Sequence, residues 1–339
     1  MNPPFGIALV GLGPGAQPHL RSLHDLRDGV VLRHAVTRRP AMADLGPFQG
    51  QLAVHDDLDA ALADPAVQGV ILATPPATHL ELAQRCFARG RHVLLEKPLD
   101  TTLERAQAIV DRARDSGCRL GVVLQFRFKP GAVALQEALV SGRLGRVQAA
   151  SVRVPWWRPQ SYYDQAGRGT LARDGGGVLL TQAIHMIDLF RALVGVRSVD
   201  AAQVHRTGLH AMETEDHAQA LLTLGNGAPG HLMATTAMLP GWPETIEVIG
   251  TRGSALLQGG ALQLQTLDGE RLDIACEGGT GSGANIMDFS HDAHRAVLQD
   301  FVGAARQGHA PRVNGEDALA TQRLIAQVLE RAGGIRPGP

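Results

Sequence analysis

The sequence predicts an α/β protein with an N-terminal Rossmann domain and a C-terminal α/β domain that has an open, mostly antiparallel sheet. Residues 1–125 alternate short, continuously apolar runs with helix-length segments, which is typical of a parallel sheet buried on both faces. Beyond about Gln125–Pro130 the runs become longer and alternate in polarity, as in Thr245–Ile249, which indicates strands with one exposed or partner-covered face. A length of 339 residues suits two domains, so we place their boundary after residue 125.

Each predicted strand of the first domain is a short apolar run bounded by a helical pattern or a turn. These runs are Ile7–Val10, Val31–Val36, Val67–Ala73, His92–Leu95 and Leu120–Leu124, with helices at Thr78–Arg89 and Leu103–Ser116. In the second domain a long apolar helix is expected at about Gly177–Val194, and two helices close the chain at about Asp292–Gln307 and Glu316–Arg331. The predicted strands there are Ala218–Leu224, Gly230–Ala237, Thr245–Ile249, Gly253–Leu257, Ala261–Gln265 and Arg271–Ala275.

The composition points away from several classes of partner. There are 32 basic and 33 acidic residues mixed along the chain, so electrostatics predict neither a nucleic-acid nor a membrane partner. No early apolar run is long enough for a signal segment or a membrane span. Three scattered cysteines (Cys86, Cys118 and Cys276) suit a reducing cytoplasm, and no cluster has zinc-site spacing, so no metal is expected.

A glycine-rich turn follows the first predicted strand and opens a helix. It runs Gly11-Leu12-Gly13-Pro14-Gly15-Ala16 and fits the pattern G-x-G-x-x-A. In such a turn Gly11 bends the chain, Gly13 lets backbone amides approach a pyrophosphate, and Ala16 keeps the helix close to the strand. We therefore expect residues 1–125 to bind a dinucleotide, and 126–339 to bind substrate and to oligomerise, with the final helices able to pack back on the Rossmann domain.

The end of the second strand carries Thr37-Arg38-Arg39, with no acidic residue before Asp44. An acidic residue there would bind the ribose 2′-hydroxyl of NAD, whereas a guanidinium can hold the 2′-phosphate of NADP. The pattern favours NADP, with NAD as the alternative. The arginines are otherwise explained as solvated surface charge.

Glu96-Lys97-Pro98 ends the strand His92–Leu95. Ligands of open α/β sheets bind outside the carboxyl ends of the strands, so Lys97 is expected to point toward the cofactor. A lysine there can hydrogen-bond a substrate oxygen and exchange a proton as hydride moves. From position alone, a solvated loop lysine is the commoner explanation.

The long apolar helix carries a polar stripe of Thr181, His185 and Asp188, spaced to share one face. A polar stripe on a buried helix must be paired internally or face a cleft. His185 is either a substrate contact or a satisfied core histidine. Asp188 is expected to orient His185 or to make a structural contact rather than to react.

Several motifs together resemble the Gfo/Idh/MocA oxidoreductases, which include glucose–fructose oxidoreductase and inositol dehydrogenase. They are Gly11-x-Gly13-x-x-Ala16-x-x-His19, Ala73-Thr74-Pro75-Pro76-x-x-His79, Glu96-Lys97-Pro98, Gln125-Phe126-Arg127-Phe128, Gly175-Gly176-Gly177-Val178-Leu179 and His185-x-x-Asp188. The resemblance runs through nearly the whole chain. It implies that Lys97 is catalytic and that His185 binds substrate or relays a proton.

The same resemblance assigns further contacts. It implies that Thr74, Pro75 and Glu96 line the nicotinamide end, that His79 is also a cofactor residue, and that Arg127 contacts cofactor and substrate. One departure matters, because inositol-dehydrogenase-like members carry Asp where this chain has Thr181. That substitution weakens an inositol assignment and any mechanism that needs a Lys–Asp–His triad.

Aromatic residues concentrate in Trp156–Tyr163, although they make up only 4% of the chain. Sugar rings pack their C–H faces on aromatic rings, so Trp157 and Tyr163 are expected to contact substrate, together with Thr181. The alternative is an anchored loop or a subunit contact. His291 and His294, before the penultimate helix, could also reach the cleft, but histidines at a helix start are usually solvated, so we expect them to be mostly solvated.

These observations predict an NADP-preferring sugar or polyol dehydrogenase that forms a homo-oligomer, a dimer or a tetramer. A second enzyme interpretation is a dihydrodiol dehydrogenase acting on a cyclic or aromatic diol. An interpretation of another class is a dinucleotide-sensing regulator, because the family resemblance includes a non-catalytic repressor. The presence of Lys97 and His185 favours an enzyme over a regulator, since a sensor does not need these two side chains.

Overall fold

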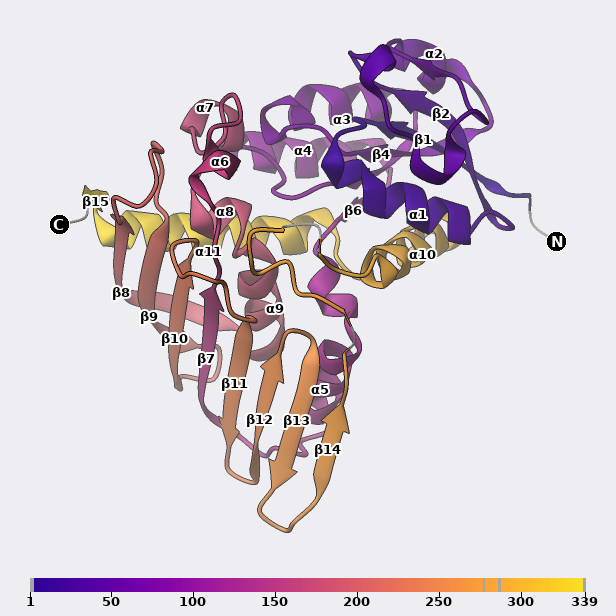
Figure 1. Cartoon of the computed structure of the whole chain (residues 1–339). Helices are drawn as coiled ribbons and strands as arrows, with labels where there is room; N and C mark the ends of the chain where they lie inside the picture. Colours follow the sequence, from indigo (N-terminus) through magenta and orange to yellow (C-terminus); the bar gives the residue numbers. More distant parts are fainter. Residues whose placement is uncertain (1–2, 277, 286–287, 338–339) are drawn as a thin grey trace. The chain divides into compact units, whose positions relative to one another are not determined.

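Each of the two units in the chain has its own sheet, and we describe each by itself. The computed structural model describes residues 3–276, 278–285 and 288–337 (Figure 1). The first unit contains Met1–Gln125 and His291–Leu319, and the second contains Phe126–Ser290 and Ala320–Pro339. The first unit therefore differs from the expected 1–125 by gaining a C-terminal segment, and the second is correspondingly shorter than 126–339.

The first unit holds a six-stranded, fully parallel sheet in the order β3-β2-β1-β4-β5-β6. Its strands are β1 (Phe5–Val10), β2 (Val30–Val36), β3 (Val54–His55), β4 (Val67–Leu72), β5 (His92–Leu95) and β6 (Leu120–Val122). All six residues of β1 are buried, as expected for a central strand covered on both faces. The strand order reverses between β1 and β4, which is where ligands bind in such sheets. The parallel Rossmann-like sheet is thus confirmed, while the two-residue β3 was not predicted.

Helices cover the parallel sheet: α1 (Gln17–Asp25), α2 (Leu58–Ala63), α3 (His79–Ala88), α4 (Leu103–Ser116) and α10 (Asp292–Gln307). The ends of α4 follow local rules, because the Thr102 hydroxyl accepts a hydrogen bond from the Arg105 amide and Gly117 ends the helix in a left-handed conformation. The C-terminal α10 runs beside α1 (Figure 1), and its Phe301 ring packs edge-on against Phe5 of β1 at 6.5 Å. This packing places α10 in the first unit.

The second unit holds a nine-stranded sheet in the order β14-β13-β12-β11-β7-β10-β9-β8-β15. Its strands are β7 (Val147–Pro155), β8 (Val196–Arg206), β9 (His217–Leu224), β10 (Pro229–Thr235), β11 (Thr245–Gly250), β12 (Gly253–Gln258), β13 (Ala261–Thr266), β14 (Arg271–Ile274) and β15 (Ile335–Pro337). Six of the eight neighbouring pairs are antiparallel, and the exceptions are β7 with β10 and β8 with β15. The expectation of a mostly antiparallel sheet is confirmed, although β7, β8 and β15 were not predicted.

One face of this sheet is covered by helices of the same unit. The covering helices α5 (Pro130–Val140), α8 (Val178–Thr181) and α9 (Ile184–Val194) contact the strands (Figure 1). The unit also contains α6 (Gln160–Tyr163), α7 (Leu171–Asp174) and most of α11 (Gly315–Ala332). Burial alternates along β9, where Ala218, Ala220 and Leu222 are buried and Gln219 and Leu221 are exposed. The opposite face of the sheet is therefore partly open.

The expected continuous helix over 177–194 is wrong. The chain breaks at Gln182 and Ala183, and the helical segments on the two sides are bent by 49°. At this break the buried side chain of Gln182 donates to the Tyr162 hydroxyl and accepts from Arg158. Among the described residues no single helix has the length and apolar composition to cross a membrane; this bent pair alone meets that test, as core helices also do.

Candidate active site

The glycine turn lies at the carboxyl end of β1, as expected. Gly11 has φ +91°, and a Cβ atom there would lie 2.4 Å from the carbonyl oxygen of Ala73. Both the backbone conformation and this close approach therefore require glycine. A Cβ at Gly13 or Gly15 would meet no atom within 4 Å. This open space lies over the start of α1, where backbone amides attract phosphate. Ala16 is fully buried, so the turn fits a dinucleotide pyrophosphate.

The three residues after β2 lie at the same edge of the sheet. The amide of Thr37 donates to the carbonyl oxygen of His55 on β3, which fixes the backbone there. Arg38 and Arg39 are exposed, so both guanidinium groups are available to a phosphate as well as to solvent. Their position agrees with the predicted 2′-phosphate contact, and their exposure agrees equally with the solvated alternative.

Lys97 and its neighbours follow the next strands at this edge. The amide of Glu96 continues the ladder by donating to Leu72 on β4, so the loop with Thr74 and Pro75 lies beside the loop with Lys97. Lys97 is partly buried and Pro75 is exposed. The strand-end placement expected for these residues is thereby reproduced within one unit.

Glu96 is held by a buried histidine that sequence analysis left without a role. His19 is completely buried, and its Nε2 donates to Glu96 Oε1 at 2.8 Å, while Glu96 Oε2 accepts from the Lys97 amide at 3.3 Å. Burial raises the pKa of Glu96, but the bond from His19 and the positive charge of Lys97 outweigh burial and hold the pKa below its usual range. An ionised Glu96 thus fixes the backbone that presents Lys97.

His294 also belongs to this cluster, so the expectation that it is solvated is wrong. It lies on α10, is only 5% exposed, and packs edge-on against the His19 ring at 5.5 Å. Burial lowers the pKa of His294 to about 3, so it is neutral. His291, by contrast, stays partly exposed and bonds Asp25. Burial of His294 could not be foreseen because it depends on where α10 packs.

His79, expected as a cofactor residue, has both ring nitrogens directed at backbone carbonyl oxygens. It is fully buried, and its ring nitrogens contact the carbonyl oxygens of Thr74, Pro98 and Leu99. The side chain therefore joins the two loops that hold Thr74 and Lys97. Its contacts are internal to the protein.

His185 lies in the second unit, on α9, and its ring stacks on Phe126 with centroids 5.1 Å apart. It is 7% exposed. Phe126 belongs to the motif Gln125–Phe128, but nothing in the motif's spacing indicated a stack with His185. The stack restricts the orientation of the imidazole ring.

Arg127, expected to contact cofactor and substrate, pairs with a buried carboxylate. Its Nε and Nη2 donate to the two oxygens of Asp188 at 2.6 Å each, and Asp188 is fully buried. The Thr321 hydroxyl donates to Asp188 Oδ1 at 2.8 Å. Asp188 therefore makes the structural contact that was one of its two expected roles.

Thr181 does not continue a stripe with His185, because the helix breaks between them. Its hydroxyl donates to the carbonyl oxygen of Gly177 at 2.7 Å, and the residue is partly exposed. Thr181 can still present its oxygen as an acceptor, but it carries no charge.

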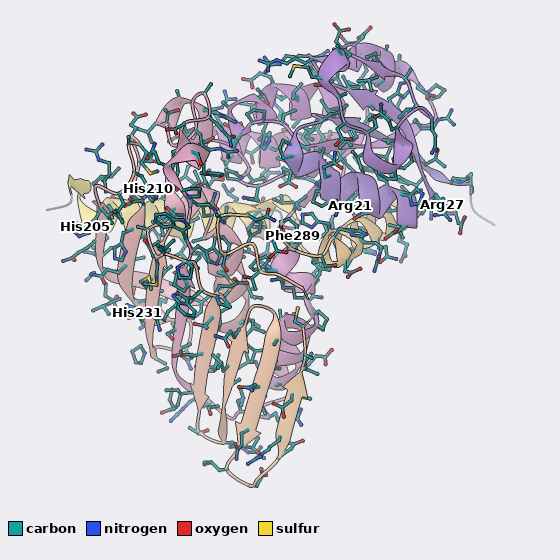
Figure 2. The ribbon with its side chains drawn as sticks, viewed as in Figure 1. Arg21, Arg27, His205, His210, His231 and Phe289 are labelled. Atoms are coloured by element: carbon teal, nitrogen blue, oxygen red, sulfur yellow. The ribbon has the colours of Figure 1, made fainter. Side chains whose placement is uncertain are left out.

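Tyr163 is buried, and its contacts are with other residues of the second unit. It is 7% exposed, its hydroxyl pairs with Thr236 Oγ1 at 2.8 Å, and its ring packs against His210 at 4.8 Å. Figure 2 labels His210. Trp157 is only partly buried and lies 5.8 Å from the same His210 ring. Of the two aromatics predicted to contact substrate, Trp157 thus retains an accessible surface.

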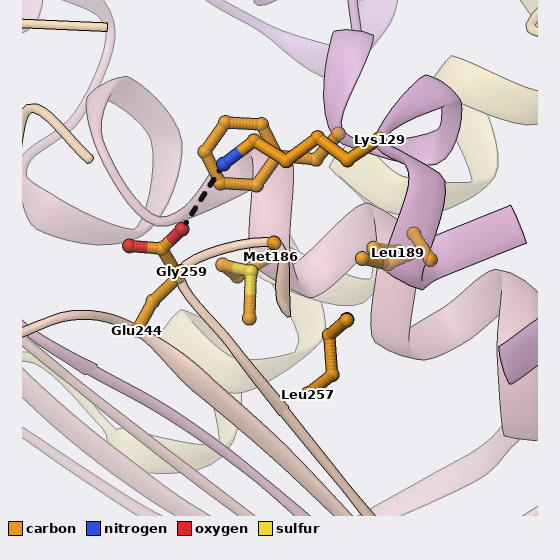
Figure 3. A pocket seen from close by; sticks show the side chains of 9 residues that line it. Lys129, Met186, Leu189, Glu244, Leu257 and Gly259 are labelled. Carbon is orange, nitrogen blue, oxygen red and sulfur yellow. Dashed lines mark hydrogen bonds and ion pairs between the residues drawn. The ribbon is translucent and has the colours of Figure 1, made fainter. Parts of the chain in front are cut away.

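A small cavity lies beneath Phe126 (Figure 3). Lys129 contributes a cation 3.8 Å from the centre of the Phe126 ring and 3.4 Å from Glu244 Oε1. Glu244 is buried and also accepts from the Trp156 indole at 3.2 Å. The cavity is otherwise apolar, with Met186, Leu189 and Leu257 among its lining residues. The Phe126 ring that lines this cavity is also the ring on which His185 stacks. The spacing of residues in the sequence did not indicate the cavity.

Glu215 supports the glycine run that precedes α8. Its carboxylate accepts from the amides of Gly177 and Leu179 at 3.1 Å each. A Cβ at Gly177 would lie 2.0 Å from the Glu215 carbonyl oxygen, so only glycine fits. Burial raises the pKa of Glu215 to about 7.

Comparison with known proteins agrees with this arrangement. Residues 5–124 match the family model of the oxidoreductase family with an NAD-binding Rossmann fold, and residues 132–256 match the GFO/IDH/MocA C-terminal domain. Inositol 2-dehydrogenase of Rhizobium meliloti (strain 1021) is 24% identical over 331 residues, or 93% of each chain. The scyllo-inositol 2-dehydrogenase (NAD(+)) of Bacillus subtilis (strain 168) is 27% identical over 76% of this chain and 72% of its own.

A solved structure extends the similarity to the whole chain. The WlbA dehydrogenase from Bordetella pertussis, crystallised in complex with NADH and UDP-GlcNAcA, is 26% identical. It superposes with a TM-score of 0.81 and covers 98% of this chain and 97% of its own.

Proposed function

Because the chain belongs to the Gfo/Idh/MocA oxidoreductase family, we propose that it moves a hydride between a nicotinamide dinucleotide and a CH–OH or carbonyl carbon of a sugar or polyol. The observation that carries the proposal is Lys97, which follows β5 at the same sheet edge as the open turn at Gly13. Relatives named for inositol as substrate support the sugar or polyol class.

Each proposed role follows from the surroundings of its side chain. The bound dinucleotide supplies or accepts the hydride. Lys97 holds the reacting oxygen and exchanges its proton, while Glu96 and His19 fix the backbone that presents it. Thr74 and Pro75 line the nicotinamide end. His185, held by Phe126, orients a substrate oxygen.

The identity of residue 181 limits which polyols we propose as substrates. A hydroxyl stands where inositol-dehydrogenase-like members have a carboxylate, so the site has one negative charge fewer. A mechanism with a charged Lys–Asp–His triad is therefore not proposed, and inositol is not the preferred substrate. Trp157, which keeps an accessible face, is proposed to pack on the sugar ring.

Three further points belong to the proposal. Thr37, Arg38 and Arg39 give a preference for NADP over NAD. The partly open face of the nine-stranded sheet pairs with a second copy, which gives a homo-oligomer. The three scattered cysteines, which have no pairing pattern in the sequence, favour the cytoplasm as its compartment.

A substrate panel tests the activity. Sugars, sugar acids, inositols and cyclic diols are assayed with NAD(H) and NADP(H) by nicotinamide absorbance, with wild type beside Lys97→Met. We expect turnover of at least one sugar or polyol that the variant loses. Turnover of cyclic diols alone would favour the dihydrodiol dehydrogenase alternative. Sugar-dependent thermal stabilisation in saturating dinucleotide, without any turnover, would favour the regulator.

A further inference from the structure

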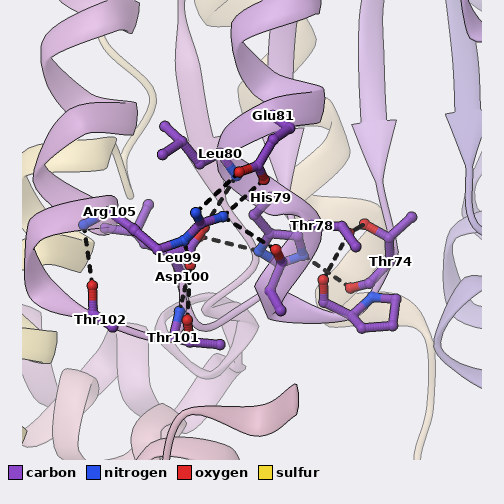
Figure 4. Close-up of polar contacts among 12 residues, drawn as sticks. Thr74, Thr78, His79, Leu80, Glu81, Leu99, Asp100, Thr101, Thr102 and Arg105 are labelled. Carbon is purple, nitrogen blue, oxygen red and sulfur yellow. Dashed lines mark hydrogen bonds and ion pairs between the residues drawn. The ribbon is translucent and has the colours of Figure 1, made fainter. Parts of the chain in front are cut away.

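His79 lies at the first position of α3 and joins two loops through its ring. Nδ1 lies 3.1 Å from the carbonyl oxygens of both Pro98 and Leu99, and Nε2 lies 2.9 Å from the carbonyl oxygen of Thr74. Figure 4 shows His79 between Leu99 and Thr74. Backbone carbonyl oxygens accept hydrogen bonds and never donate them. Each ring nitrogen therefore has to carry a proton to bond the oxygen it faces.

A neutral imidazole cannot meet this requirement. It carries a single N–H, so its other nitrogen would turn a lone pair toward a carbonyl oxygen at hydrogen-bonding distance. Burial acts most strongly on the pKa of His79 and lowers it, whereas the carbonyls of Thr74, Leu99 and Pro98 and the charge of Asp100 raise it. The contacts outweigh burial, because the charged ring donates to all three oxygens, whereas the neutral ring turns one lone pair toward a carbonyl oxygen.

A second set of bonds joins the same two loops. The fully buried Asp100 accepts from the Leu80 amide at 3.1 Å and from Arg105 Nε at 2.6 Å. Arg105 Nη2 also donates to the carbonyl oxygen of Ala77 at 3.1 Å and to Glu81 at 2.8 Å (Figure 4). Asp100 thus places a negative charge close to His79, which offsets the cost of a buried imidazolium.

We propose that His79 is a positioning residue that, as an imidazolium, clamps the loop carrying Lys97 to the loop carrying Thr74. The clamp spans the carboxyl ends of β4 and β5, so it sets the place of Lys97 relative to the nicotinamide end of the site. The inference rests on the proposed role of Lys97, but the protonation of the ring is independent of that role.

The first test separates positioning from binding. In His79→Gln one end of the amide is an oxygen, so one loop loses its donor and moves. Because small misplacements of reacting groups are costly, kcat should fall by about 10- to 100-fold, with KM and dinucleotide Kd within a few-fold. The matched control is His92→Gln at the opposite end of β5, where Nδ1 accepts from the Arg119 amide, and kcat should stay near the wild-type value.

The second test needs neither activity nor a variant. In wild-type protein with 15N-labelled histidine, nuclear magnetic resonance at neutral pH should show His79 with both nitrogens protonated. A single protonated nitrogen overturns the charged clamp, and wild-type kcat in a folded His79→Gln overturns the positioning role. If Lys97→Met is fully active instead, the proposed function fails while the resonance result still decides the clamp.

Discussion

At the scale of single residues, the two side chains proposed to act on substrate have different surroundings. Lys97 is partly buried, and the neighbouring Glu96 is held by His19. His185 is largely buried and stacks on Phe126. Substitution of Lys97 therefore mainly removes a charge, whereas substitution of His185 also removes a ring stack.

Lys97→Met keeps much of the side-chain volume and removes the charge and the proton donors. We expect kcat to fall by about 10²–10⁴, because proton transfer by a positioned group contributes that much. Dinucleotide affinity should stay within a few-fold. His185→Ala should raise KM as well, and Thr181→Ala should matter much less than either. Steady-state kinetics and calorimetry measure these effects, and near wild-type turnover by Lys97→Met would contradict the catalytic role.

The exposed arginines after β2 should determine cofactor choice. A charge-assisted phosphate contact is worth about 1.5–3 kcal/mol, so NADP should bind about tenfold or more tightly than NAD. Arg38→Ala with Arg39→Ala should weaken NADP and spare NAD. Arg33→Ala, on β2 itself and paired with Asp64, is the control and should change neither. Calorimetric titration decides, and equal or tighter binding of NAD by the wild type rules the preference out.

At the scale of secondary-structure elements, buried charges tie loops to helices. In the second unit the pair Arg127–Asp188 joins the turn at Gln125–Phe128 to α9, and Thr321 adds α11. Glu215 likewise holds the glycine run before α8. These carboxylates matter because each supports an element that carries a proposed substrate residue.

Asp188→Asn should be strongly destabilising, since it removes the buried carboxylate that pairs with the buried guanidinium of Arg127. The expected loss is about 3–5 kcal/mol in the free energy of unfolding, measured with urea. The control is Glu270→Gln, which breaks an exposed bidentate pair with Arg143 and should cost less than about 1 kcal/mol. If both variants lose a similar free energy of unfolding, burial does not make the Arg127–Asp188 pair more important for stability than an exposed pair.

Glu215 should make stability depend on pH. Its pKa of about 7 in the folded protein lies above the ordinary 4.5, so its contribution is fully present below about pH 4.5 and is lost as pH rises through 7. Between about pH 5.5 and 8.5 the wild type should lose about 2 kcal/mol relative to Glu215→Gln. Urea unfolding at both pH values measures this difference. Parallel pH profiles for the two proteins would refute it.

At the scale of the whole molecule, the exposed face of the nine-stranded sheet carries apolar as well as polar side chains. Leu221 on β9 is 57% exposed and Ile249 on β11 is 55% exposed. Sheets with such a face are commonly covered by another subunit. We expect light scattering at micromolar concentration to give at least twice the mass of one chain, and Leu221→Lys to lower it. A wild-type monomer would remove the oligomer proposal.

Part of this architecture could be read from local patterns. The strand and helix limits in the first unit fall within about two residues of the periodic runs, because a buried parallel strand is apolar throughout. The glycine turn and the strand-end position of Lys97 are local as well. The break at Gln182 was missed, because the apolar pattern continues through it and the bond of Gln182 to Tyr162 joins residues 20 positions apart.

The sequence by itself determined the fold class, the dinucleotide turn and the lysine at the end of β5, since each depends on residues close together in the chain. Only the tertiary structure decided which polar groups are bonded internally. His79 turned inward to carbonyls about 20 residues away, Arg127 went to Asp188 at a separation of 61, and His294 became buried against His19. Such partners are chosen by packing, because a buried polar group must find whichever donor or acceptor the fold brings near, however distant in sequence.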